Sequence, residues 1–83
     1  MTPEIFFEDL AKIVTYHRKK SGLNRAELAR LAGVGKTAVY DVEHGKPTVR
    51  LDTVMKILHV LNIKIDFTGP LMHLYKAAEN EKR

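Results

Sequence analysis

The stretch from Ser21 to Lys46, SGLNRAELARLAGVGKTAVYDVEHGK, predicts two short helices joined by a tight turn. Asn24 is a favourable N-cap residue, and the glutamate three positions later completes a capping box, so a helix is expected over residues 25–32. Gly33 ends this helix, because glycine readily adopts the left-handed backbone conformation found after a helix C-terminus. A second helix is expected over residues 36–44, with glycine on both sides of it.

The flanking sequence predicts two further helices and one strand. A Thr-Pro-Glu start signal, followed by apolar residues at helical spacing, indicates a helix over residues 4–20. A second apolar face at helical spacing indicates another helix over residues 51–61. Residues 63–67, IKIDF, alternate apolar and polar side chains and are rich in β-branched and aromatic types, as strands are.

A chain of 83 residues is long enough for one domain. We expect that domain over residues 1–68, including the strand, and a C-terminal tail over residues 69–83 with a possible helical turn. The fold class is therefore all-α, with four or five helices and one C-terminal β-strand. On the second and fourth helices, the residues expected to face the core are Leu28, Leu31, Ala32, Leu51, Val54, Met55, Leu58 and Leu61.

Composition limits the classes of function. The net charge of +4 favours a polyanionic partner. There is no cysteine, and the four histidines are not paired at helical spacing, so we expect no disulfide and no metal site. No apolar run is long enough to span a membrane, and cytoplasm is the expected location. No phosphate loop and no nucleophile with a matched base are present, so we expect neither an enzyme nor a bound cofactor.

Several residues of the two-helix stretch resemble one known family. They are Gly22-Leu23-Asn24, Glu27-Leu28-Ala29, Gly33-Val34, Val39 and Glu43-His44-Gly45, and they resemble the XRE, or Cro-type, helix-turn-helix proteins. The continuation from Gly45 to Val54, together with the strand at residues 63–67, is similar to the HipB-type antitoxin branch. The resemblance covers about residues 8–68. It implies a lambda-repressor-like fold in a cytoplasmic homodimer bound to palindromic operator DNA. In the HipB-type branch it also implies a partner, a HipA-like serine/threonine kinase toxin, which the protein neutralises while it represses their shared operon.

In this family the outer face of the helix at residues 36–44 enters the major groove of DNA. Lys36 can donate to a guanine edge, and Thr37 can contact a thymine methyl group or a phosphate. Tyr40 can reach a base edge or the backbone, whereas Asp41 accepts only from cytosine and repels phosphate. The expected DNA-binding residues, counting phosphate contacts from the second helix and the loops, are Arg25, Gly35, Lys36, Thr37, Tyr40, Asp41, Lys46, Thr48 and Arg50. The alternative for each is an ordinary solvent-exposed position.

Two of these positions depart from the family pattern. Arg25 stands where relatives usually have a glutamine that binds phosphate, and arginine can make the same contact with added charge. Gly35 stands where relatives usually have a polar or basic residue, so the third helix has no side-chain cap. Its N-terminal backbone amides can still bind a phosphate.

The strand has no partner within the chain. Its backbone groups therefore need a strand from another molecule, and we expect antiparallel pairing with a second copy. The expected dimer interface consists of Leu61, Ile63, Ile65 and Phe67, and the alternative is that these side chains belong to the core. Such a dimer would hold two recognition helices about one DNA turn, ~34 Å, apart.

Arg18 and Glu43 have a structural interpretation. Related repressors pair an arginine late in the first helix with the glutamate that ends the recognition helix, and both positions match here. We therefore predict an ion pair within the chain.

Three functions remain open from the sequence. The first is a repressor that is also the antitoxin of a HipA-like kinase. The second is a stand-alone regulator without a toxin. The third is a protein-interaction module whose DNA binding has decayed, an alternative that Gly35 and Asp41 keep open.

Overall fold

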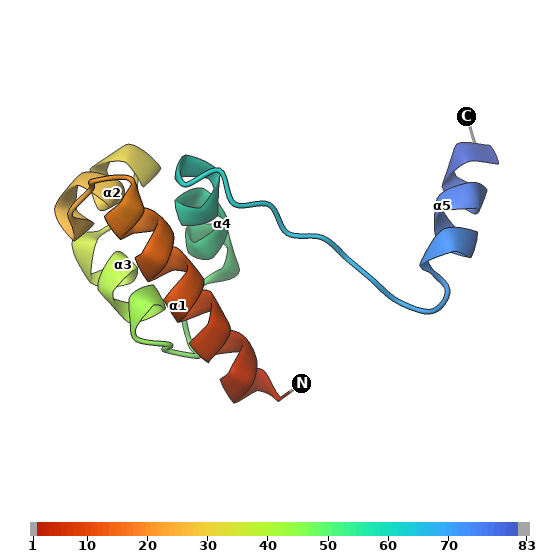
Figure 1. Ribbon diagram of the computed structural model, residues 1–83, viewed down its shortest axis with the longest axis horizontal. Coiled ribbons are helices and arrows are strands. Elements are labelled where there is room, and N and C mark those ends of the chain that lie inside the picture. Colours follow the sequence, from red (N-terminus) through yellow and green to blue (C-terminus); the bar gives the residue numbers. More distant parts are fainter. Residues whose placement is uncertain (1, 82–83) are drawn as a thin grey trace.

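The computed structural model describes residues 2–81, so the first predicted domain residue and the last two tail residues lie outside the described part. Within residues 2–81 the chain forms five helices. They are α1 (Pro3–Lys20), α2 (Arg25–Ala32), α3 (Lys36–Glu43), α4 (Leu51–Val60) and α5 (Met72–Glu81). The first four helices pack into one body, and an extended segment carries α5 away from it (Figure 1). The all-α fold class and the helix boundaries agree with the prediction to within a residue or two, except that α5 is a full helix.

Local capping explains why the helix boundaries follow the sequence so closely. The Glu27 N–H donates to Asn24 Oδ1 over 2.8 Å, and the Asn24 N–H donates to Glu27 Oε1 over 2.9 Å, so the predicted capping box begins α2. Gly33 ends α2 with φ +69°, in the left-handed region. These contacts join residues close in sequence, so they depend little on the rest of the fold.

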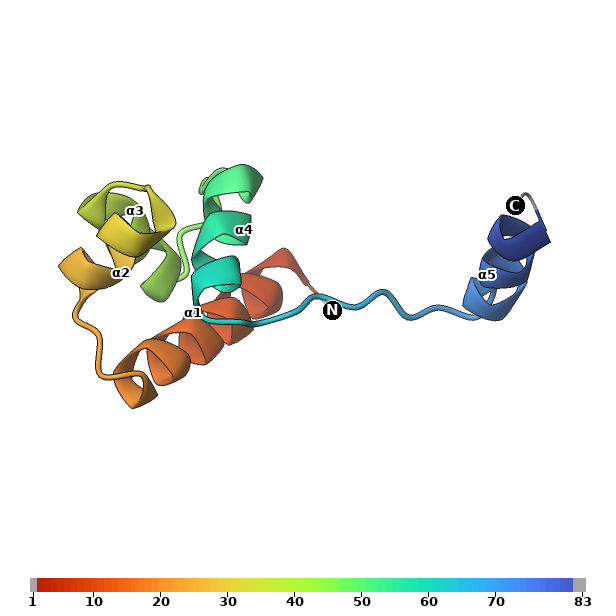
Figure 2. The same ribbon diagram turned by 90° about the horizontal axis from the view of Figure 1, so that it is seen from above.

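The core lies where the first four helices meet, with α1 running along one side of the body (Figure 2). Its fully buried large side chains are Leu28, Ile57, Val14, Val39 and Val42. Burying one such side chain contributes roughly 1.5–3 kcal/mol. Because Val39 and Val42 point inward, the opposite face of α3 is turned to solvent.

Part of the predicted core was wrong. Leu31 and Met55 are 51% and 46% exposed, and Leu51 is exposed as well, whereas Ala29 and Ile57 are buried. These short helices carry apolar residues over more than one face, so periodicity does not select a single inward direction. The neighbouring helices decide which of those faces is covered.

The predicted β-strand is absent from residues 2–81, where residues 63–67 are extended but form no strand. One protomer offers no second strand, and without a ladder of backbone hydrogen bonds an extended segment is not part of a sheet. Leu61 belongs to the core of its own chain, and Ile63 packs against that core. Ile65 and Phe67 are 50% and 74% exposed. Pairing between copies stays a prediction, and it now concerns residues 63–67 without Leu61.

The tail is more ordered than the single turn expected from its sequence. Helix α5 spans ten residues, and none of its side chains is buried. Among residues 2–81, no helix combines the length and the apolar character needed to cross a bilayer.

Candidate nucleic-acid interface

The turn between α2 and α3 fixes the direction in which α3 points. Its N-terminal part is held by the Val34 N–H, which donates to the Ala29 carbonyl over 3.0 Å, and the Val34 side chain packs against the core. Gly35 is the N-cap of α3 and makes no side-chain hydrogen bond, as expected for glycine. The first N–H groups of α3 therefore have no side-chain acceptor and remain able to donate to an anion.

The outer face of α3 presents three of the predicted contact residues together. Lys36, Thr37 and Tyr40 are all exposed and lie within four residues of one another, about one helical turn. Asp41 lies beside them but is only partly exposed, and its Oδ2 is 3.5 Å from Lys46 Nζ. The lysine after α3 therefore balances the one negative charge on this face, which makes the acidic residue compatible with a phosphate backbone nearby.

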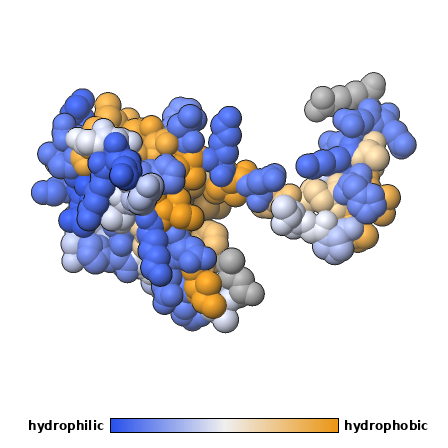
Figure 3. All heavy atoms as spheres, in the orientation of Figure 1, coloured by the Kyte–Doolittle hydropathy of each residue, from blue (hydrophilic) through white to orange (hydrophobic). Residues whose placement is uncertain are grey.

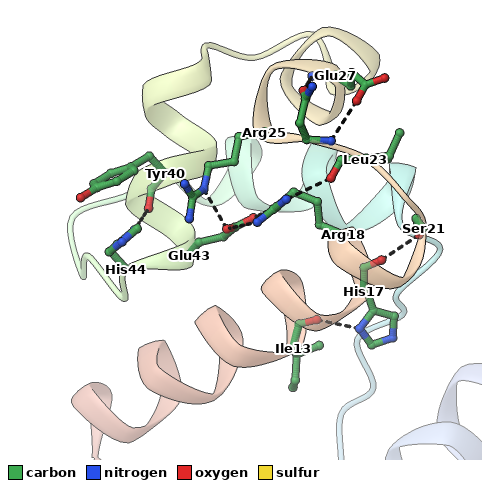
Figure 4. A network of polar contacts seen from close by, with 11 residues as sticks. Ile13, His17, Arg18, Ser21, Leu23, Arg25, Glu27, Tyr40, Glu43 and His44 are labelled. Carbon is green, nitrogen blue, oxygen red and sulfur yellow. Dashed lines mark hydrogen bonds and ion pairs between the residues drawn. The ribbon is translucent and has the colours of Figure 1, made fainter.

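A network centred on Glu43 joins three helices behind this face (Figure 4). Arg18 of α1 donates from Nε to Oε2 over 2.5 Å and from Nη2 to Oε1 over 3.0 Å. Arg25 of α2 donates from Nε to Oε1 over 3.0 Å. The structure thus brings together Arg18 and Glu43, the pair expected from the sequence, and adds an arginine that sequence reasoning had assigned only to DNA.

Burial decides the electrostatics of this network. The side chains of Arg18 and Glu43 are 9% and 1% exposed. Burial raises the pKa of Glu43, but the hydrogen bonds from Arg18 and Arg25 more than offset it and hold that pKa below its usual value. Glu43 is therefore a carboxylate at neutral pH, and its charge fixes the two guanidinium groups in place.

Arg25 has a second contact, with the aromatic face of α3. Its guanidinium carbon lies 5.4 Å from the centroid of the Tyr40 ring, a cation–π geometry. Tyr40 is in turn stacked on His44, with ring centroids 3.8 Å apart and planes 19° from parallel. Sequence reasoning missed His44, although its spacing of four residues from Tyr40 on a helix was a usable signal. These contacts orient both Arg25 and Tyr40 before any ligand binds.

A basic hollow lies at the start of α2, with a volume of about 350 Å³. It is lined by Arg18, Asn24, Arg25, Ala26 and Lys36. The N–H groups of the first residues of α2 precede any intrahelical acceptor, and a helix N-terminus favours an anion. The hollow therefore has the charge and the donors that suit one phosphate. Ala26 was missed in the sequence because an alanine carries no functional group, and only its backbone position matters.

The remaining predicted residues lie apart from this hollow. Thr48 is exposed in the loop after α3. Arg50 is exposed at the start of α4, where it donates to both carboxylate oxygens of Asp52 over 3.0 and 3.2 Å. These hydrogen bonds raise the pKa of Arg50 and lower the pKa of Asp52. Arg50 is therefore engaged with a neighbouring carboxylate, which a phosphate would have to displace or share.

Comparison with known proteins agrees with this geometry. Residues 16–67, which include α2, α3 and α4, match the sequence model of a protein family described as helix-turn-helix. The chain is also 39% identical over 62 residues to an uncharacterized HTH-type transcriptional regulator of Sinorhizobium fredii. That alignment covers 75% of this chain and 82% of the relative.

Proposed function

This chain belongs to the XRE helix-turn-helix family of DNA-binding transcriptional regulators, and we propose on that basis that it is a repressor that binds a palindromic operator as a homodimer. The observation that carries the proposal is the outer face of α3, where Lys36, Thr37 and Tyr40 are exposed while Glu43 anchors the helix from behind. A helix fixed in this way enters the major groove without first having to order itself, and this lowers the cost of binding.

The proposed contacts divide into two kinds. Lys36, Thr37 and Tyr40 read base edges, because they project from the first turns of α3. Arg25 and the hollow at the start of α2 hold a phosphate and thereby set the position of α3 along the groove. Further phosphate contacts come from the amides at Gly35 and from Lys46, Thr48 and Arg50.

The proposed dimer forms through residues 63–67, the extended segment after α4 whose backbone groups form no strand ladder within residues 2–81. Ile65 and Phe67 are exposed on an extended backbone, and the apolar side chains of Ile5, Phe6 and Ile13 on α1 are nearly half exposed. Antiparallel pairing of residues 63–67 satisfies that backbone, and association of two copies covers apolar area that a short chain leaves in water.

The finer assignment is that the protein is a HipB-like antitoxin, which neutralises a HipA-like serine/threonine kinase and represses their operon. It is supported by the resemblance of Gly45 to Val54 and of residues 63–67 to that branch. A second candidate, a stand-alone regulator, is supported by the relative from Sinorhizobium fredii, whose name mentions transcription and no toxin. Co-expression with a HipA-like kinase encoded beside the gene separates them. The antitoxin assignment requires that the kinase co-purifies with this protein and loses its activity. A kinase that stays separate and active would contradict that assignment and favour the stand-alone regulator.

DNA binding is tested by selecting duplexes from a random-sequence pool and measuring the affinity of the winners. We expect a palindrome with half-sites about one turn, ~34 Å, apart. Lys36→Ala is expected to weaken binding to it by about 1–3 kcal/mol, roughly 5- to 150-fold. Lys76→Ala on α5 removes the same charge outside the interface and serves as the matched control. No enriched duplex, or equal losses in both variants, would contradict the proposal and favour an interaction module that no longer binds DNA.

A further inference from the structure

An apolar groove lies between α2 and α4, with a volume of about 260 Å³. It is lined by Leu31, Ala32, Met55, Lys56, His59 and Val60, none of which is an expected DNA contact. Leu31 and Met55, which were expected in the core, are about half exposed and line this groove. Its other feature is charge, because the lining includes the cationic Lys56.

Helix α5 has an apolar face that no other part of residues 2–81 buries. Leu71, Leu74, Tyr75 and Ala78 follow the spacing of one helical stripe, and the first three are 57–66% exposed. Figure 3 shows apolar side chains both on the helical body and on the distant α5. A ten-residue helix is marginal in water by itself, so α5 requires a surface on which to pack.

The path of the chain indicates which surface that is. Ile63 is fixed beside the end of α4, because its N–H donates to the Leu58 carbonyl over 2.9 Å. In an antiparallel pair with the two-fold axis at Ile65, Ile63 lies opposite Phe67 of the partner subunit. The partner chain therefore arrives at the C-terminal end of α4, the helix whose last residues include His59 and Val60 of the groove. Only four residues separate position 67 from the start of α5, so the two positions lie at most about 18 Å apart.

We propose that α5 of each subunit docks in the α2–α4 groove of the other subunit. The extended segment carries α5 away from its own body (Figure 1). The inference rests on the proposed dimer, because only pairing of residues 63–67 would place a partner within reach of α5. Leu74 and Tyr75 pack against Leu31 and Met55 across the interface. Charge supports the same match, because Glu81 lies at the end of α5 beside its apolar stripe, and the groove contains Lys56. Each subunit thus contacts the other through its own α5 as well as through residues 63–67.

The chain contains no cysteine, so engineered disulfides give an unambiguous test. A Leu31→Cys protein carrying a tag is mixed with an untagged Leu74→Cys protein, equilibrated in a glutathione buffer and analysed without reductant. We expect a covalent dimer that contains one chain of each type, because a disulfide requires Cβ atoms about 4 Å apart. His73→Cys, on the opposite side of α5, is the matched control and is expected to cross-link to Leu31→Cys at least tenfold less.

Ile65→Cys separates the failure of this inference from that of the dimer. Position 65 faces its own copy at the two-fold axis, so this variant forms a symmetric disulfide if the segments pair. A symmetric cross-link without the Leu31–Leu74 cross-link would refute the docking of α5 and leave the dimer standing. Absence of both, with a monomer in sedimentation at micromolar concentration, would overturn both proposals. A protein that carries Leu31→Cys and Leu74→Cys together provides the last comparison, and a disulfide formed within one of its chains would show that α5 folds back onto its own groove, which also contradicts the exchange.

Discussion

Replacement of Glu43 by alanine is expected to destabilise this protein more than any other single change on the α3 side. The carboxylate is almost fully buried and accepts hydrogen bonds from Arg18 and Arg25. Its removal leaves the buried Arg18 guanidinium with only its hydrogen bond to the Leu23 carbonyl. Breaking a buried pair in this way costs about 3–5 kcal/mol. The free energy of unfolding of a domain of this kind is about 5–15 kcal/mol in total, so Glu43→Ala removes a large share of it.

The reasoning is tested by urea unfolding followed by circular dichroism at a fixed protein concentration, because dimerisation makes stability depend on concentration. Arg25→Ala is the first comparison. Its side chain is 36% exposed and it makes one of the three hydrogen bonds, so its loss is expected to cost only about 1 kcal/mol. The second comparison is the double variant Arg18→Met with Glu43→Leu, which removes both charges together and is expected to be near neutral or stabilising.

Two results would refute this reasoning. A loss below about 1 kcal/mol for Glu43→Ala would mean that the remaining Arg18 charge is easily hydrated, and that the network is not a buried one. A double variant as unstable as Glu43→Ala would mean that shape at this site matters more than charge. In the double variant Arg25 also loses its anchor, so operator affinity is expected to fall even where the fold is kept.

Three further predictions concern the same region. The pKa of Glu43 in the folded protein lies below the ordinary value of 4.5, so this carboxylate stabilises the fold above pH 4.5, and the stabilisation is lost as pH falls through the folded pKa. In thermal melts, the Tm of Glu43→Gln should therefore depend less on acid pH than that of the unchanged protein. Identical profiles would contradict the assignment. Gly35→Ser should stabilise the fold by about 0.5–1 kcal/mol in urea unfolding, because φ is −73° and a Cβ meets open space; a loss of stability would show that α3 does not begin there. Asp41→Ala should raise affinity for any duplex, because Lys46 loses its carboxylate partner and can contact a phosphate. The slope of log affinity against log salt concentration should then steepen by about one phosphate contact. An unchanged slope in titrations between about 50 and 200 mM salt would place Lys46 outside the interface.

The local sequence determined the elements of this protein. Asn24 and Gly33 set the bounds of α2 through contacts within a few residues, and helical periodicity located α1 and α4. The valines of α3 then implied which side of that helix faces outward. The resemblance to relatives identified the pairing of Arg18 with Glu43, which lie 25 positions apart and which no local rule connects.

Tertiary packing alone decided how those elements are used. It placed Arg25 against Glu43 and Tyr40, and it moved Leu31 and Met55 from the expected core to an open groove. It also left residues 63–67 without a strand, because a ladder needs a second backbone. The physical reason is one of range. Caps and periodicity act between residues within one or two turns, whereas burial and ion pairing depend on which distant helix lies alongside.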